Sequence, residues 1–395
     1  MAQPTPRPPR PGVSAFIIPP LAGLLLALLC GLALNAQTPT PTPSDALALE
    51  QQGKLADAEK AWRSILASNP QDAAAHASLG VVLSKQGKYA EAARAYRQAL
   101  AVNPKLPGVQ LNLGLAEFKQ GHFRLAIAPL NASLSADPQN NQARTLLGMS
   151  YYGAQRFADA AKTLEPVAKA DPGNTELHRI LAQSCLLAKN YNCALEEFRQ
   201  ILQQDPNSPA AHMLMGEALD GLGRTVEAIT EFQAAAKAAP TPPNANFGLG
   251  YLFWKQHKYE EAQNAFEAEL ALDPSHAPAL AYLGDIAFKK NDRQKALPLL
   301  TKAARLNPAI RIAHLDIGAI LTEQKQYQQA LASLLKAEKL DSTQPDAHYR
   351  LARLYRQMGN TTAAEREFAK VRELHQKEDE ALVHQMPKAA PELKP

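Results

Sequence analysis

The sequence predicts an all-α protein built as a solenoid of stacked antiparallel helix hairpins. Three observations predict this fold. A period of 34 residues runs without insertion from residue 39 to residue 378, Ala and Leu dominate while aromatic residues make up only 6% of the chain, and a proline closes nearly every period. Ala and Leu favour helices, and proline ends a helix because it lacks an amide donor. A repeated unit that buries its apolar face only against its neighbours folds as a solenoid.

The ten periods begin at residues 39, 73, 107, 141, 175, 209, 243, 277, 311 and 345. Position twenty is Ala in every period, and position eight is Gly or Ala. We expect these two small residues to face each other across each hairpin. The large residue at position twenty-four, such as Trp62 or Phe266, should fill the space toward the next repeat. Proline at position thirty-two of the first eight periods predicts the end of the second helix.

This pattern of Leu-Gly, Ala, aromatic and Pro at set positions resembles the tetratricopeptide repeat family, whose period is also 34 residues. The resemblance covers residues 39–378. It implies a right-handed superhelix in which the first helices of the hairpins line an inner, concave surface. Ala replaces Gly at position eight in repeats one, five and ten, and Pro is lost after repeat nine. Atypical end repeats are expected because the end units of a solenoid lack one neighbour.

The N-terminal residues predict a segment separate from the solenoid. Residues 1–36 are typical of an export signal, because Arg7 and Arg10 precede an apolar run of 14 residues from Leu21 to Leu34. Such a run is short for a membrane span. The signal-peptide interpretation predicts a periplasmic or secreted protein.

The alternative is an uncleaved anchor over residues 13–34, which would tether the protein to the inner membrane. Residues 37–44 predict an extended Pro/Thr-rich linker in either case. At the other end, a charged helix should run from Thr362 to Met386. Residues 379–395 should therefore comprise a helical extension and a disordered tail.

Composition and motifs argue against catalysis, nucleic-acid binding and metal binding by this chain. The 42 basic and 38 acidic residues give a formal charge of +4, which is too small to indicate nucleic-acid binding. Five of the histidines, His178 and His212 among them, fall at position four of their repeats, so the repeat pattern explains them better than a metal site. No phosphate-binding loop, zinc-ligand spacing or nucleophile motif stands out. We expect no enzyme activity, no cofactor, no metal and no small-molecule substrate.

Two cysteines of the fifth repeat predict a cross-link. Cys185 and Cys193 stand at positions eleven and nineteen, on either side of the turn at residues 189–191, and so face each other across one hairpin. In an exported protein they can form a disulfide. The alternative is two small buried residues, because free cysteines pack well in cores.

The resemblance places positions two, five, nine, twelve and thirteen of each repeat on the inner surface. Repeat seven is richest there, with Tyr251 and Trp254, and such aromatic side chains bury large areas on binding at low entropic cost. The alternative is that these rings pack against neighbouring inner helices and each other. The candidate groove residues are Phe118, Tyr152, Arg179, Gln183, Glu217, Phe247, Tyr251, Trp254, Asp285 and Phe288.

The sequence therefore predicts a non-catalytic scaffold that binds a peptide or protein in its concave groove, in the bacterial cell envelope. Two alternatives remain open. One is a structural solenoid that assembles with itself through its ends and convex face. The other is a recruiting or regulatory subunit of an envelope biogenesis or glycosyltransferase complex, with the catalysis on another chain.

Overall fold

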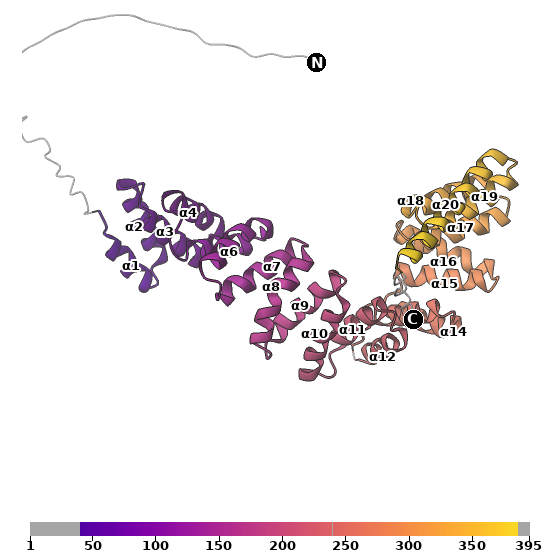
Figure 1. Ribbon diagram of the computed structural model, residues 1–395, viewed down its shortest axis with the longest axis horizontal. Helices are drawn as coiled ribbons and strands as arrows, with labels where there is room; N and C mark the ends of the chain where they lie inside the picture. Colours follow the sequence, from indigo (N-terminus) through magenta and orange to yellow (C-terminus); the bar gives the residue numbers. More distant parts are fainter. Residues whose placement is uncertain (1–39, 239, 386–395) are drawn as a thin grey trace, which may run out of the picture. The chain divides into compact units, whose positions relative to one another are not determined.

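The computed structural model describes residues 40–238 and 240–385, and all regular structure in those ranges is helical (Figure 1). The predicted signal or anchor over residues 1–36, the first three residues of the predicted linker and the end of the tail lie outside the described residues. The chain divides into two compact units, residues 1–71 and residues 72–395. Within the described ranges, no helix combines the length and the apolar character that crossing a bilayer requires.

The described part of the first unit, residues 40–71, holds one hairpin, made of α1 (Pro43–Gln51) and α2 (Leu55–Ser68). The hydroxyl oxygen of Thr42 accepts the N–H of Asp45, and the Asp45 carboxylate accepts the N–H of Thr42 at 2.9 Å. This reciprocal cap starts the helix at Pro43. The linker predicted for residues 37–44 therefore ends earlier, because its last two residues are helical.

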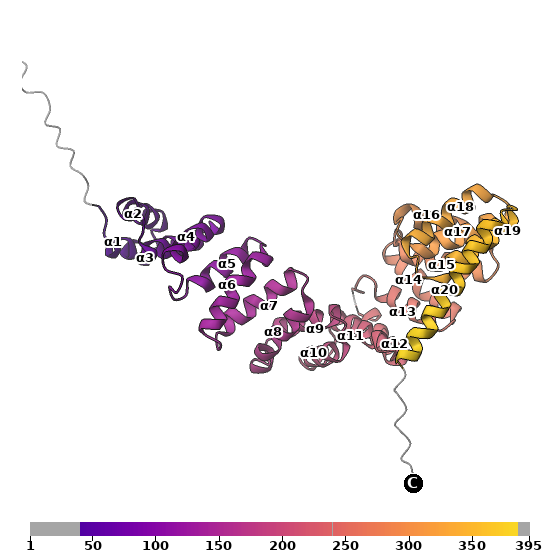
Figure 2. The same ribbon diagram turned by 45° about the horizontal axis from the view of Figure 1, so that its top comes forward.

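The second unit holds nine hairpins that follow one another in chain order (Figure 2). Their first helices are α3 (Ala73–Lys85), α5 (Val109–Lys119), α7 (Asn141–Gly153), α9 (Thr175–Leu187), α11 (Pro209–Gly221), α13 (Ala245–Lys255), α15 (Ala277–Lys289), α17 (Arg311–Glu323) and α19 (Pro345–Gln357). Their second helices are α4 (Tyr89–Val102), α6 (Phe123–Ala136), α8 (Phe157–Ala170), α10 (Tyr191–Gln204), α12 (Thr225–Ala236), α14 (Tyr259–Leu272), α16 (Arg293–Leu306), α18 (Tyr327–Leu340) and α20 (Thr361–Gln385).

The helix ends largely match the periods. Most second helices stop two residues before the proline at position thirty-two, as predicted. The C-terminal helix was expected over 362–386 and is observed over 361–385. Two first helices, α5 and α13, start two residues later than their periods predict. In both, the residue at position two, Gly108 or Asn244, has a positive φ and delays the helix.

Each hairpin turns at position fifteen, which has a positive φ in all ten repeats. The amide of the next residue then bonds back to the carbonyl of position eleven, for example Asn190 to Cys185 at 2.8 Å. This is the hydrogen bond of a Schellman cap. Only half of these positions are glycine. Gln155, Lys189, His257, Asn291 and Lys325 adopt the same left-handed conformation.

The small residue at position eight makes room for the residue at position twenty-four of its own hairpin. A Cβ added to Gly250 would lie 2.7 Å from the ring of Phe266, and one on Gly148 would lie 2.4 Å from Leu164. Position twenty-four therefore packs within its own hairpin as well as toward the next repeat, which corrects the prediction. Phe232 shows both contacts, because its ring also abuts Gly248 of the following repeat.

Candidate functional site

The first helices form the inner side of the second unit. Successive first helices contact one another from α3 to α5, α5 to α7, α9 to α11 and onward to α19, in addition to the contacts that each makes with its hairpin partner. Among the described helices of this unit, α7 and α9 approach each other less closely than the other neighbouring first helices do. Side chains still bridge α7 and α9, because the Tyr152 hydroxyl donates to Gln183 at 3.2 Å.

A cavity of about 560 Å³ lies beside this wider helix spacing, between α5, α7, α8 and α9. Its size falls within the ~300–1,000 Å³ of typical ligand pockets. Apolar side chains form its walls and amides, a hydroxyl and carboxylates lie among them. The lining residues are Leu115, Asn141, Gln142, Thr145, Leu146, Met149, Val167, Ala170, Asp171, Asn174, Glu176, Leu177 and Ile180.

The inner faces of the first helices of repeats eight and nine, α15 and α17, are buried. On α17, ten successive residues from Ala313 to Thr322 are buried, and Leu315 at the inner position five is only 6% exposed. On α15, Ala281 and Asp285 are buried in the same way. The contacts of α15 with α17 and of α17 with α19 cover this face. A partner therefore finds little open surface on these two helices.

The predicted aromatic cluster of repeat seven exists, and its rings pack on one another. Tyr251 stacks on Phe247 and on Trp254 with centroids 6.4 and 6.1 Å apart. Tyr282 of the next repeat stands edge-on to Tyr251 at 5.6 Å and to Trp254 at 4.9 Å. Each ring is half-buried. The cluster joins repeats seven and eight and leaves part of each ring open.

Polar contacts hold the Trp254 ring in place. Its indole N–H donates to a carboxylate oxygen of Asp285 at 2.6 Å, and the Lys289 ammonium pairs with the same carboxylate and lies 5.2 Å from the indole centroid. Asp285 is 2% exposed. The prediction that Asp285 lines an open groove is therefore corrected, because its carboxylate is used inside the protein to position Trp254 and Lys289.

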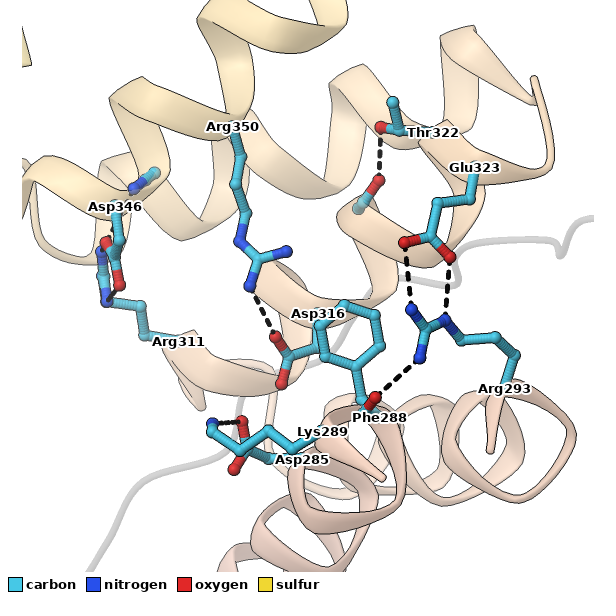
Figure 3. A network of polar contacts seen from close by, with 12 residues as sticks. Asp285, Phe288, Lys289, Arg293, Arg311, Asp316, Thr322, Glu323, Asp346 and Arg350 are labelled. Carbon is cyan, nitrogen blue, oxygen red and sulfur yellow. Dashed lines mark hydrogen bonds and ion pairs between the residues drawn. The ribbon is translucent and has the colours of Figure 1, made fainter. Parts of the chain in front are cut away.

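A second buried carboxylate, Asp316, lies next to Asp285 (Figure 3). Arg350 donates to one oxygen of Asp316 at 3.3 Å, while the other oxygen has no hydrogen-bond partner among the described residues. Burial, together with the like charge of Asp285, raises the pKa of Asp316 to about 8 against the attraction of Arg350 and Lys289. Asp285, Asp316 and Arg350 thus link the first helices of repeats eight, nine and ten.

Phe288 is covered by cations. The Arg293 guanidinium lies 4.3 Å and the Arg350 guanidinium 5.4 Å from its ring centroid. Arg293 also pairs with Glu323 at 2.8 Å and donates to the Phe288 carbonyl at 2.6 Å (Figure 3). Phe288 was predicted to face a partner, and the structure instead places it in this network.

Two other predicted aromatics follow a common pattern. Phe118 and Tyr152, both at position twelve, pack edge-on against the aromatic residue at position seventeen of the same repeat, at 5.5 and 5.6 Å. The Tyr152 hydroxyl also donates to the Gln183 side chain at 3.2 Å. Both rings are half-buried, so each retains an open edge on the inner side.

The remaining predicted groove residues lie on α9 and α11. Arg179 pairs with Glu176 and also donates to Gln183 at 3.2 Å, and it lies exposed near the cavity. Glu217 is exposed, and the partial loss of water around its carboxylate raises its pKa above the ordinary value. The structure thus brings Tyr152, Arg179 and Gln183 together and places Glu217 in the next repeat.

The position-four histidines join the two helices of their hairpins. In repeats five, six and ten the Nδ1 atom lies 2.5, 2.6 and 2.7 Å from a glutamate at position twenty-three. In His212, His314 and His348 the Nε2 atom faces a backbone carbonyl six residues earlier. In His178 it has no hydrogen-bond partner among the described residues, and Gln204 instead donates to the equivalent carbonyl. These contacts support the explanation by repeat pattern.

The structure joins Cys185 and Cys193 in a disulfide, with Cα atoms 5.7 Å apart. This separation lies within the range that disulfides adopt. We expect protein isolated from an oxidising compartment to have a mass lower by two hydrogen atoms than the protein with free thiols. Reduction of the disulfide should lower the free energy of unfolding by about 2 kcal/mol, because the bond closes a short loop. Mass spectrometry without reductant measures the first, and two free thiols there would contradict the prediction.

Position six was absent from the predicted inner surface, yet it supplies several of the residues described above. Leu146 and Ile180 line the cavity, and Tyr282, Asp316 and Arg350 form the contacts between repeats seven and ten. The sequence contained a signal for these contacts, because position six is aromatic or charged in three successive repeats, eight to ten. In repeats eight to ten, position six contacts the first helix of the preceding repeat, so its size and charge affect how closely the two helices approach.

Glu269 was also missed. Its buried carboxylate accepts the backbone N–H of Asn244 at 2.9 Å and of Phe247 at 3.1 Å. The helix α13 has no cap from its own N-cap side chain, so a residue of α14 supplies it. This contact sets the start of the helix that bears Tyr251 and Trp254. No local pattern could show it, because the two partners are more than twenty residues apart.

Comparison with protein families identifies the repeats. A tetratricopeptide repeat model matches residues 45–107, 79–141, 145–209 and 247–299, which together make up more than half of the chain. Further repeat models of the same description match residues 185–246 and 346–377, and a TPR repeat model matches residues 318–359. No curated protein matches the chain.

Comparison with solved structures finds matches at low identity. The APC/C hetero-tetramer Cut9–Hcn1 is 15% identical over 84% of this chain and 79% of that chain, with a TM-score of 0.50. Pseudomonas aeruginosa pilF is 18% identical over 51% and 91%, with a TM-score of 0.46, and yeast Tom70 is 16% identical over 84% and 91%, with a TM-score of 0.40. Tetratricopeptide repeat proteins bind protein partners and are typically non-catalytic. The chain belongs to the tetratricopeptide repeat family and is a protein-interaction scaffold.

Proposed function

We propose that this scaffold is exported or membrane-tethered and holds an extended segment of a partner protein on the inner side of repeats three to seven, in the bacterial cell envelope. The observation that supports this most is the cavity between α5, α7, α8 and α9, which is lined by the first helices of three successive repeats. The half-buried rings around Trp254 add a second, partly open apolar surface at repeat seven. The apolar N-terminal run and its preceding arginines support export or tethering.

Site-specific crosslinking tests the binding role. A photo-crosslinking amino acid replaces Gln142, which is exposed and lines the cavity, in the full chain with its own N-terminus, expressed in its native cells. We expect a discrete crosslinked partner. Lys162 is exposed on the second helix of the same repeat and serves as the matched control. Absence of a partner at Gln142, or the same partners at both positions, would contradict binding in the groove.

Self-assembly is the second candidate, and a separate observation favours it. Apolar side chains are exposed on second helices, away from the inner side, with Val226 76% and Leu125 58% exposed. Removal of such side chains from water on association would stabilise an assembly, at roughly 25 cal/mol per Å² of apolar surface. A mass that rises with concentration in light scattering, together with crosslinks of the chain to itself, would support this function over capture of another protein.

A further inference from the structure

The chemistry of the cavity specifies the segment that it can hold, and this inference rests on the proposed function. Leu115, Met149 and Ile180 come from three successive first helices, and Val167 comes from α8. These side chains are aliphatic or thioether groups, which need no hydrogen-bond partner when buried. An entering side chain is therefore stabilised by removal of apolar surface from water, at roughly 25 cal/mol per Å². The walls suit Leu, Ile or Met.

The rim offers amides that are free to bind a backbone. Asn141 and Gln142 are exposed at the start of α7, and neither side chain makes a hydrogen bond to any residue that the structure describes. Each amide carries both a donor and an acceptor, which matches the alternating groups of an extended chain. Asn174, by contrast, is committed to capping α9, because its side-chain oxygen accepts the N–H of Leu177.

The charge at the cavity is negative on one side. Its lining contains Asp171 and Glu176 and no Lys or Arg. Glu176 is already paired with Arg179. Asp171 forms no ion pair with any described residue, and its side chain accepts only from the Asn174 amide, at 3.2 Å. Asp171 also follows the last turn of α8, where the helix dipole adds partial negative charge.

We propose that the cavity binds an extended peptide segment of another protein that inserts a Leu, Ile or Met side chain between α5, α7 and α9 and places a neighbouring Lys or Arg at Asp171. The apolar side chain supplies most of the desolvated area. The basic side chain sets the direction of the segment, because only the Asp171 end of the cavity has an unpaired carboxylate.

The test selects binders from a phage library of random dodecapeptides, using the folded solenoid as bait. The selected sequences should carry an aliphatic residue close to a Lys or Arg. For peptides synthesised from these sequences, Asp171→Lys should weaken binding about tenfold or more in fluorescence anisotropy, the scale of one charge-assisted contact. Met149→Asp should weaken it similarly by placing a charge against the apolar side chain.

Asp205→Lys is the matched control. Asp205 follows α10 as Asp171 follows α8, it is exposed, and it does not line the cavity. Selection of no peptide, selection of acidic peptides, or equal weakening by Asp171→Lys and Asp205→Lys would overturn the inference. Thermal unfolding shows that each variant is folded. A partner crosslinked at Gln142 through an acidic segment would overturn this inference and leave the proposed function standing.

Discussion

Replacing Ala262 with Arg should lower the free energy of unfolding by about 3 kcal/mol or more, the scale of overpacking combined with a buried polar group. Ala262 stands at position twenty of repeat seven and is fully buried. It packs with Phe266, Leu283 and Ile286 in one core cluster. An arginine there must either place an unpaired charge in this core or push α13 and α14 apart.

Ala268→Arg is the control for this experiment. Ala268 lies on the same helix, α14, and is exposed, so the substitution changes charge and helix propensity without filling a core position. Urea denaturation followed by circular dichroism measures both variants. Equal stability of the two would mean that the repeat register assigned to position twenty is wrong.

Replacing Asp316 with Asn should change how stability depends on pH, by an amount on the order of a few kcal/mol. The pKa of Asp316 rises from 3.8 when unfolded to about 8 in the fold. The folded protein therefore binds a proton that the unfolded chain has lost between about pH 4 and pH 8. This contribution to stability is fully present at the acid end of that window and is lost as the pH rises to 8.

Asparagine resembles the protonated carboxyl and cannot ionise. The stability of Asp316→Asn minus that of the wild type should therefore increase from pH 5 to pH 8.5. Taking the difference cancels groups that titrate in both proteins. The groups that face Asp316 are Asp285, Lys289 and Arg350. Asp346→Asn is the control, because Asp346 is more exposed and pairs with Arg311 at the edge of the same network. A flat difference for Asp316→Asn would contradict the raised pKa.

Much of the fold could be predicted from particular positions. The alanines at position twenty and the prolines at thirty-two recur with the period, and each acts within its own hairpin. The structure confirms their places. The turn at position fifteen has no such pattern in the sequence, because Gln155, Lys189 and His257 adopt the left-handed conformation that glycine favours. Here the packing of two helices outweighs the local preference of the residue.

The candidate site was predicted less well, for a physical reason. Asp285 and Phe288 were expected on an open groove because their positions face inward. Whether an inward residue is open depends on how closely the next first helix approaches. That distance depends on side chains such as Tyr282 and Asp316 in adjacent repeats, which meet only after the hairpins stack.

The sequence by itself determined the family, the ten hairpins, most helix ends and the absence of a recognisable catalytic motif, because these follow from a local pattern repeated along the chain. Only the tertiary structure showed that the inner faces of α15 and α17 are buried and that a cavity lies between α5, α7, α8 and α9. The spacing of successive helices is a property of contacts between repeats. It arises from the joint size and charge of side chains that no single period contains.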